Sequence, residues 1–230
     1  MKKAILIQAR LSSTRFPNKM MHELNNCSLI EYVYNRCKNS TIANQVIVIT
    51  SNDLTDDPLY DLCIKKQIPV FRGNLHDVLH RYIEASKFYN VDIICRVCGD
   101  SPFVDIGAID TMFNEVEEKQ LDYMCASQTI NGFISEIVTS RALNDIYSCD
   151  IDRNDKEHVT RYIKNNKKLF KCRELKLGFE NKKLNFHPLT VDYPKDLYVV
   201  NLVAKELLGY SFSSKDIVDI LTNSKVQNDL

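Results

Sequence analysis

Short apolar runs alternate with amphipathic segments through the first half of the chain. Apolar runs without polar alternation are typical of strands buried on both faces of a sheet, and they occupy residues 3–9, 45–50, 69–71 and 92–98. Apolar residues three and four positions apart predict helices at 28–37, 58–66, 74–89 and from 105 onward. This alternation predicts a mainly parallel sheet with helices on both faces, a three-layer α/β/α Rossmann-like fold.

Local signals indicate where these helices begin. Ser28 and Glu31 have the spacing of a capping box, and Pro58 suits a first helical turn. Asn74 and Asp105 are expected to cap the helices that follow them.

The second half of the chain has a less regular pattern. It predicts strands at 133–139, 170–177 and 189–191, the second alternating like an antiparallel strand, and helices at 157–165, 194–208 and after 213. No repeat, low-complexity segment or linker rich in Gly, Pro or Ser interrupts the chain. We therefore expect residues 1–230 to form a single domain, with 123–178 an excursion from the main sheet.

The overall charge argues against a nucleic-acid partner. Lys plus Arg and Asp plus Glu each number 30, so the basic excess typical of nucleic-acid binders is missing. The apolar run from Ala4 to Ile7 is too short for a signal-peptide core, and no stretch approaches the roughly 18 apolar residues that span a bilayer. We expect a cytoplasmic protein without a membrane partner.

Among the eight cysteines, only Cys95 and Cys98 have a metal-like spacing. Positions three apart on a strand face opposite sides of a sheet, so these sulfurs would not bind one ion. We therefore expect no zinc site.

The loop after the first strand concentrates cations and hydroxyl groups. It includes Arg10, Arg15 and Lys19, which can pair with phosphate oxygens. Neither G-x-G-x-x-G nor the Walker pattern occurs here, which counts against an oxidoreductase, and the alternative for this loop is a solvated basic turn. We expect a triphosphate to contact Gln8, Ala9, Arg10, Ser12, Ser13, Thr14, Arg15 and Lys19.

Two aspartates follow predicted strands. Asp100 comes after the strand ending at Cys98, and Asp192 after the short strand at 189–191. Ligands of such sheets bind beyond the carboxyl ends of strands, and Mg²⁺ is usually held by one or two carboxylates plus substrate phosphates. We expect Asp100 and Asp192 to bind Mg²⁺; the alternative for each is a helix N-cap.

The loop sequence QARLSSTRFPNKM resembles the signature of SpsF-type cytidylyltransferases (spore-coat polysaccharide biosynthesis protein F and relatives), which are similar to CMP-KDO and CMP-sialic acid synthetases. The resemblance continues in order through FRGNLHDVLHRY, RVCGDSPFVD, EHVTRYI and LTVDYPKD, over most of the chain. It implies a Mg²⁺-dependent enzyme that transfers CMP from CTP to a sugar acid or related hydroxyl-bearing metabolite, releasing pyrophosphate, in surface-polysaccharide precursor synthesis. It also favours a homodimer, with 123–178 serving dimerisation or the acceptor site.

The resemblance implies roles for further residues. Arg10, Lys19 and Asp100 are expected to be catalytic. Arg72 would approach the base or ribose, or alternatively belong to a surface turn. Glu136 would face the acceptor sugar, and His158 would contact the acceptor or support a dimer.

Some positions depart from the family pattern. Ser12 replaces a common glycine, Ile134 stands where an acid is usual, and His187-Pro188 replaces a frequent aromatic or basic pair. The last two leave the acceptor undefined. Another nucleoside triphosphate, a phosphorylated acceptor, or a catalytically silent nucleotide sensor therefore remain as alternatives.

Overall fold

The central sheet contains seven strands in the order β5-β4-β1-β6-β8-β7-β9. The computed structural model describes residues 1–179 and 189–222. Neighbouring strands are parallel except that β8 runs antiparallel to both β6 and β7. The predicted α/β fold with a mainly parallel sheet is confirmed. The strands are β1 (Lys3–Gln8), β4 (Gln45–Ser51), β5 (Val70–Gly73), β6 (Ile93–Cys98), β7 (Tyr123–Ser127), β8 (Glu136–Thr139) and β9 (Cys172–Lys176).

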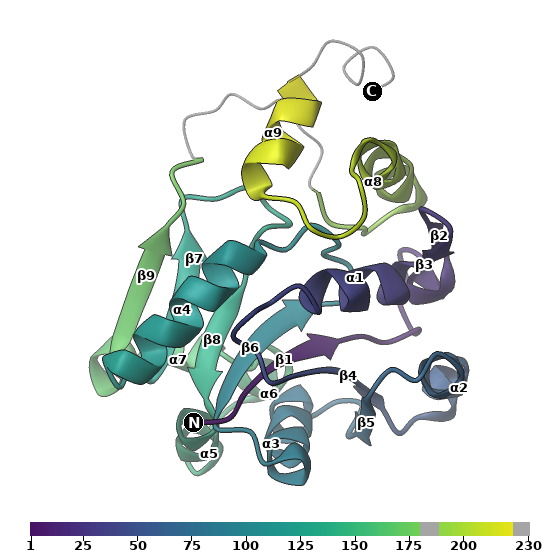
Figure 1. Cartoon of the computed structure of the whole chain (residues 1–230). Coiled ribbons are helices and arrows are strands. Elements are labelled where there is room, and N and C mark those ends of the chain that lie inside the picture. The colour runs from purple at the N-terminus through teal and green to yellow at the C-terminus, as the bar shows by residue number, and fades with distance from the viewer. Residues whose placement is uncertain (180–188, 223–230) are drawn as a thin grey trace.

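Helices cover both faces of this sheet, as Figure 1 shows. Successive side chains of β1 point to opposite faces: Ile5 and Ile7 join one apolar core, and Ala4 and Leu6 join the other. The first core is covered by α1 (Leu29–Cys37), α2 (Asp57–Lys65), α4 (Ile106–Glu118), α8 (Pro194–Glu206) and α9 (Ser214–Thr222). The second is covered by α3 (Val78–Tyr89), α5 (Ser140–Tyr147) and α7 (Arg161–Asn165), with α6 (Arg153–Glu157) packed on α3.

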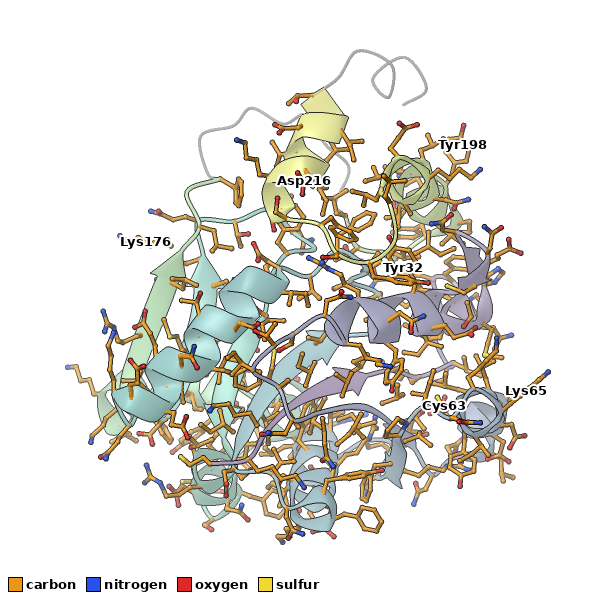
Figure 2. All side chains as sticks on the ribbon, in the orientation of Figure 1. Tyr32, Cys63, Lys65, Lys176, Tyr198 and Asp216 are labelled. Atoms are coloured by element: carbon orange, nitrogen blue, oxygen red, sulfur yellow. The ribbon has the colours of Figure 1, made fainter. Side chains whose placement is uncertain are left out.

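The helices bury one side and expose the other. On α2, Cys63 is fully buried whereas Lys65 points away from the body of the protein (Figure 2).

None of the helices in residues 1–179 and 189–222 combines the length and apolar character that a membrane crossing requires.

Helix α1 begins at the predicted capping box, which the structure confirms. Ser28 Oγ accepts the Glu31 N–H at 3.4 Å, and Glu31 Oε2 accepts the Ser28 N–H at 3.1 Å. The remaining small elements are a two-stranded ribbon, β2 (Glu23–Leu24) and β3 (Cys27–Ser28), and three 3-10 turns, Lys19–Met21, Leu54–Asp56 and Lys167–Leu169.

The two predicted caps differ in outcome. Asp105 caps α4 by accepting the Ala108 N–H at 2.9 Å, as predicted. Asn74 does not cap α3; Asp77 does, and Asn74 instead accepts two N–H groups of the preceding turn. The cap prediction for Asn74 was wrong because the capping residue lies three positions later, at Asp77, and the helix begins at Val78.

The second half of the chain departs most from the sequence prediction. Strand β7 and helix α5 were not predicted, and β9 is parallel to β7 rather than antiparallel. Of the helix predicted at 157–165, only 161–165 forms a helix, α7, because α6 ends at Glu157; residues 189–191 form no strand. Segment 123–178 is not an excursion from the sheet, because it supplies β7, β8 and β9.

Candidate active site

The loop between β1 and the turn at Lys19–Met21 is anchored by two buried apolar side chains. Leu11 and Phe16 are 4% and 6% exposed, whereas Arg15 between them is exposed. The Leu11 carbonyl accepts backbone N–H groups of Ser13 at 2.8 Å and Asn18 at 3.2 Å. These contacts fold the loop back on itself and leave its hydroxyls and guanidinium groups facing outward.

Asp56 holds this loop from the core side. It is fully buried, and its Oδ1 accepts the Leu11 N–H at 2.6 Å. Its Oδ2 accepts the backbone N–H of Ser51 at 3.2 Å and also the Ser51 hydroxyl. Asp56 therefore joins the end of β4 to the loop after β1, a role that the sequence analysis missed because Leu11 lies 45 positions away.

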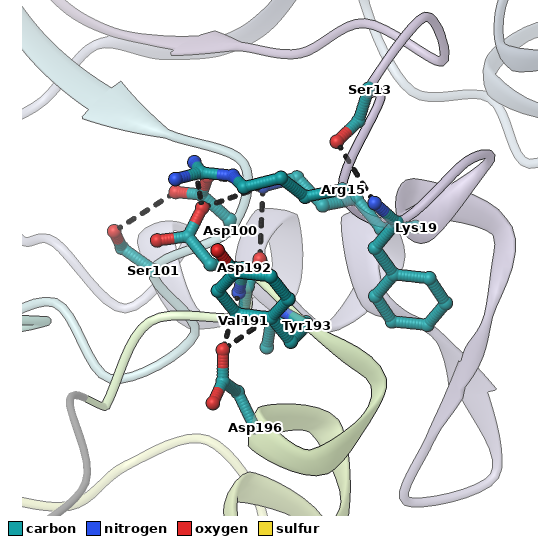
Figure 3. Close-up of polar contacts among 10 residues, drawn as sticks. Ser13, Arg15, Lys19, Asp100, Ser101, Val191, Asp192, Tyr193 and Asp196 are labelled. Atoms are coloured by element: carbon teal, nitrogen blue, oxygen red, sulfur yellow. Dashed lines mark hydrogen bonds and ion pairs between the residues drawn. The ribbon is translucent and has the colours of Figure 1, made fainter.

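Lys19 brings both predicted carboxylates together. This side chain is nearly buried, and its Nζ lies 2.6 Å from Asp100 Oδ2 and 3.7 Å from Asp192 Oδ1 (Figure 3). Its Nζ also donates to the Val191 carbonyl at 2.9 Å. The loop after β1, the end of β6 and the segment before α8 thus converge on one ammonium group.

The turn that carries Asp192 is fixed by two further contacts. Its backbone N–H and that of Tyr193 both donate to Asp196 Oδ2, at 2.9 and 2.8 Å. Its carboxylate accepts Arg15 Nη2 at 2.5 Å, and the Arg15 guanidinium lies 5.6 Å from the centre of the Tyr193 ring. Figure 3 shows the Arg15 side chain reaching from the loop to Asp192.

Neither aspartate is a helix cap, the alternative considered for both. The residue that caps α4 is Asp105, and α8 begins after Tyr193. Asp100 and Asp192 instead pair with Lys19 and Arg15 and border the space in front of the cationic loop.

That space is a pocket of about 390 Å³. Every residue predicted to contact the triphosphate or the metal lines it: Gln8, Ala9, Arg10, Ser12, Ser13, Thr14, Arg15, Lys19, Asp100 and Asp192. The sequence did not predict its other lining residues, Met20, Val78, Arg81, Cys98 and Glu157.

Asp100 and Asp192 fit the needs of a hard divalent cation. Both carboxylates reach the same ammonium nitrogen, so they lie close enough to share one ion. Mg²⁺ typically takes one or two carboxylates and completes its shell with water and substrate phosphates. Within residues 1–179 and 189–222 no group of three His, Cys, Asp or Glu side chains could hold a metal, so an ion here would depend on the phosphates.

Arg72 lies outside this pocket, and the expected contact with the base or ribose has no support in the geometry. Its Nε and Nη2 donate to the carbonyls of Ser51 and Asp53 at 2.8 and 2.9 Å, and Nη2 pairs with Asp57 at 2.7 Å. The guanidinium therefore braces the turn after β4, which is the alternative that the sequence analysis left open.

The Glu136 carboxylate belongs to a buried network of hydrogen bonds and ion pairs. Its Oε2 accepts Arg96 Nη1 at 2.5 Å and the Thr160 hydroxyl at 2.9 Å, while Oε1 accepts the Tyr123 hydroxyl at 2.7 Å and pairs with Lys164. Burial alone would raise its pKa, but Arg96 and Lys164 outweigh this and lower the pKa from 4.5 to about 2. With four partners, the carboxylate organises the site rather than offering free oxygens to an acceptor.

A second pocket, of about 250 Å³, adjoins the first and shares Cys98, Asp100 and Asp192 with it. Glu136 and the exposed Ile134 are part of its lining. His158 does not line either of these pockets; it lines a third, of about 340 Å³, together with Arg96, Thr160, Arg161, Lys164 and Asn165. His187 and Pro188 lie outside the described residues.

The two cysteines of β6 lie in different environments. Cys95 is fully buried, whereas Cys98 is exposed at the carboxyl end of the strand.

A mainly parallel α/β sheet with a cationic loop and two carboxylates at one edge is typical of proteins that bind phosphorylated ligands. Comparison with known proteins identifies the family. A sequence profile described as "Cytidylyltransferase" matches residues 4–208. The chain belongs to this cytidylyltransferase family, as the sequence resemblance predicted, and is therefore a nucleotidyltransferase.

Individual relatives agree with this assignment. The chain is 31% identical to the spore coat polysaccharide biosynthesis protein SpsF of Bacillus subtilis, over 83% of the chain and 81% of SpsF. It is 33% identical to the 3-deoxy-manno-octulosonate cytidylyltransferase of Chloroherpeton thalassium, over 60% of the chain and 56% of that enzyme. Its structure is similar to that of a cytidylyltransferase from Leptospira borgpetersenii, with a TM-score of 0.91 and 29% sequence identity. The similarity covers 98% of this chain and 96% of that protein.

Proposed function

We propose that this cytidylyltransferase uses Mg²⁺ and CTP to transfer CMP to a hydroxyl group of a sugar acid, releasing pyrophosphate, in the synthesis of a surface-polysaccharide precursor. The observation that carries the proposal is the convergence of Lys19, Asp100 and Asp192 beside the cationic loop. The names of the two curated relatives support the sugar-acid acceptor and the polysaccharide pathway.

In this proposal the loop binds the triphosphate. Arg10, Arg15 and Lys19 offset the phosphate charge, and backbone N–H and hydroxyl groups of 12–14 contact the remaining oxygens. Asp100 and Asp192 hold Mg²⁺, which when bound offsets negative charge on the phosphate oxygens.

The reaction joins the acceptor oxygen to the α-phosphorus, breaks the bond between that phosphorus and the bridging oxygen, and releases the proton of the acceptor hydroxyl to water. Negative charge grows on the bridging oxygen as pyrophosphate leaves, and the cations of the loop stabilise it. The protein contributes mainly by holding nucleotide and acceptor in line, and the second pocket adjoins the two aspartates.

The test is a pyrophosphate-release assay with each of the four nucleoside triphosphates, with and without Mg²⁺, and a panel of sugar acids that includes 3-deoxy-manno-octulosonate and N-acetylneuraminate. We expect release only with CTP, Mg²⁺ and an acid. Asp100→Asn should abolish release, whereas Asp110→Asn, an aspartate on α4 that accepts hydrogen bonds from Ser40 and Thr41, should not. Release with another triphosphate, or full activity of Asp100→Asn, would contradict the proposal.

The cytoplasmic location and the homodimer remain predictions. Sedimentation equilibrium of the purified chain tests the dimer, and a mass of about one chain across the concentration range would refute it.

A further inference from the structure

The second pocket contains unusual polar groups. Its lining includes Arg96, Ser135 and Thr190, and each carries a buried polar atom without a hydrogen-bond partner: Nε, Oγ and Oγ1 respectively. Among the described residues only eight side-chain atoms are buried and unpartnered in this way. Three of the eight therefore belong to residues of one small pocket.

Such groups are costly, because a buried donor or acceptor loses its hydrogen bonds to water and gains none in return. Ser135 is 1% exposed and its backbone is fixed, since its carbonyl accepts the Ala126 N–H at 3.2 Å. Thr190 is held next to Val191, whose N–H donates to the Asp100 carbonyl at 2.9 Å. Rotation about a single side-chain bond can turn either hydroxyl without moving this backbone.

The position of the pocket suggests what would satisfy these groups. It shares Asp100 and Asp192 with the triphosphate pocket, so a molecule bound there lies next to the expected α-phosphate. We propose that this pocket is the acceptor subsite and that Ser135 and Thr190 hydrogen-bond the hydroxyl groups of a polyhydroxylated sugar acid. This inference rests on the proposed function and adds to it two hydroxyl side chains, Ser135 and Thr190, that were not among the expected acceptor contacts.

Arg96 explains why the molecule would be an acid. Its Nη1 is occupied by Glu136 and Thr160, whereas Nε has no acceptor. The guanidinium stays charged, and its partner Glu136 has no free oxygen lone pair directed at a ligand once its four contacts are made. An unpaired charged donor of this kind favours a carboxylate oxygen over a neutral hydroxyl.

The competing explanation is that the hydroxyls of Ser135 and Thr190 are unpaired because of imperfect packing and bind no ligand. Thr50 provides a matched control, because its Oγ1 is also buried and unpartnered but the residue lies in β4 and lines neither pocket. Replacing an unpaired threonine hydroxyl by a methyl group should raise Tm at both positions, whereas ligand binding should change only at the pocket.

The experiment titrates 3-deoxy-manno-octulosonate and N-acetylneuraminate into the wild-type protein, Ser135→Ala, Thr190→Val and Thr50→Val by calorimetry, without nucleotide. We expect the wild type and Thr50→Val to bind at least one acid equally well. Ser135→Ala and Thr190→Val should each weaken its binding roughly threefold to tenfold, the value of one hydrogen bond, with CTP affinity unchanged. Equal binding by all four proteins, or no binding of either acid to the wild type, would overturn the subsite.

Measuring pyrophosphate release distinguishes a failure of the acceptor subsite from a failure of the proposed function. Pyrophosphate release with an acid whose KM is the same in Ser135→Ala and Thr190→Val would refute the subsite alone. Acid binding that depends on both hydroxyls, without release from CTP, would refute the proposed reaction and leave the subsite standing.

Discussion

Replacing Glu136 by Gln should destabilise the protein by roughly 3 kcal/mol at neutral pH. Glu136 is 8% exposed and its pKa is lowered from 4.5 to about 2. Each pKa unit corresponds to about 1.4 kcal/mol, so the charged form contributes roughly 3 kcal/mol to the free energy of unfolding. Removing one partner of a buried ion pair typically costs about 3–5 kcal/mol, which agrees with this value because Arg96 would keep its charge.

The pH dependence has a definite sign. The pKa of Glu136 is lower in the folded protein than in the unfolded chain, so its contribution is complete above about pH 4.5. It is lost progressively as the pH falls towards 2. The difference in stability between the wild type and Glu136→Gln should therefore be constant near neutral pH and shrink in acid.

Glu117→Gln is the matched control. Hydrogen bonding, chiefly from Lys3, lowers the pKa of Glu117 to about 2 as well, but this side chain is 36% exposed and screened by water. It should therefore contribute less than about 1 kcal/mol. Urea unfolding of the three proteins between pH 3 and pH 7 measures the differences. Equal losses in the two variants, or a Glu136→Gln loss that does not change with pH, would refute the reasoning.

Two further substitutions test how the site is positioned. Asp56→Asn should raise KM for CTP on the order of tenfold with a smaller change in kcat, because an amide nitrogen would face the backbone N–H of Leu11 or of Ser51; an unchanged KM in steady-state assays would count against this role. Gly132→Ala should lower the free energy of unfolding by about 1–3 kcal/mol, because φ is 110° and a Cβ would lie 2.7 Å from the Leu189 carbonyl oxygen. Thermal unfolding measures this loss. Gly107→Ala is the control that should change stability little, because Gly107 is exposed on α4 and a Cβ there would meet only Asp105 Oδ1, at 3.4 Å.

The sequence predicts the first half of the fold well because the signals there are local. Strands β1 and β4 contain the apolar runs 4–7 and 46–49, most of which are buried, and β6 is apolar except for Arg96. The cationic loop and Asp100 were also predictable, since the parallel strands β1 and β6 bring their carboxyl ends to one edge. Asp192 reaches the same site although the strand predicted before it does not form.

The remaining features depend on contacts between distant residues. Strand β7 has only five residues and no alternation, and the direction of β9 depends on its pairing with β7. The roles of Asp56 and Arg72 depend on partners that the fold brings to them. Glu136 pairs with Arg96 because the register of β8 against β6 places the two residues opposite each other.

The most direct test of the proposed site is a crystal structure of the protein with CTP and Mg²⁺. The account predicts one metal ion bound to Asp100, Asp192 and the triphosphate, with Arg10, Arg15 and Lys19 around the phosphates. A triphosphate bound away from residues 8–19, or a metal ion that contacts neither aspartate, would contradict it.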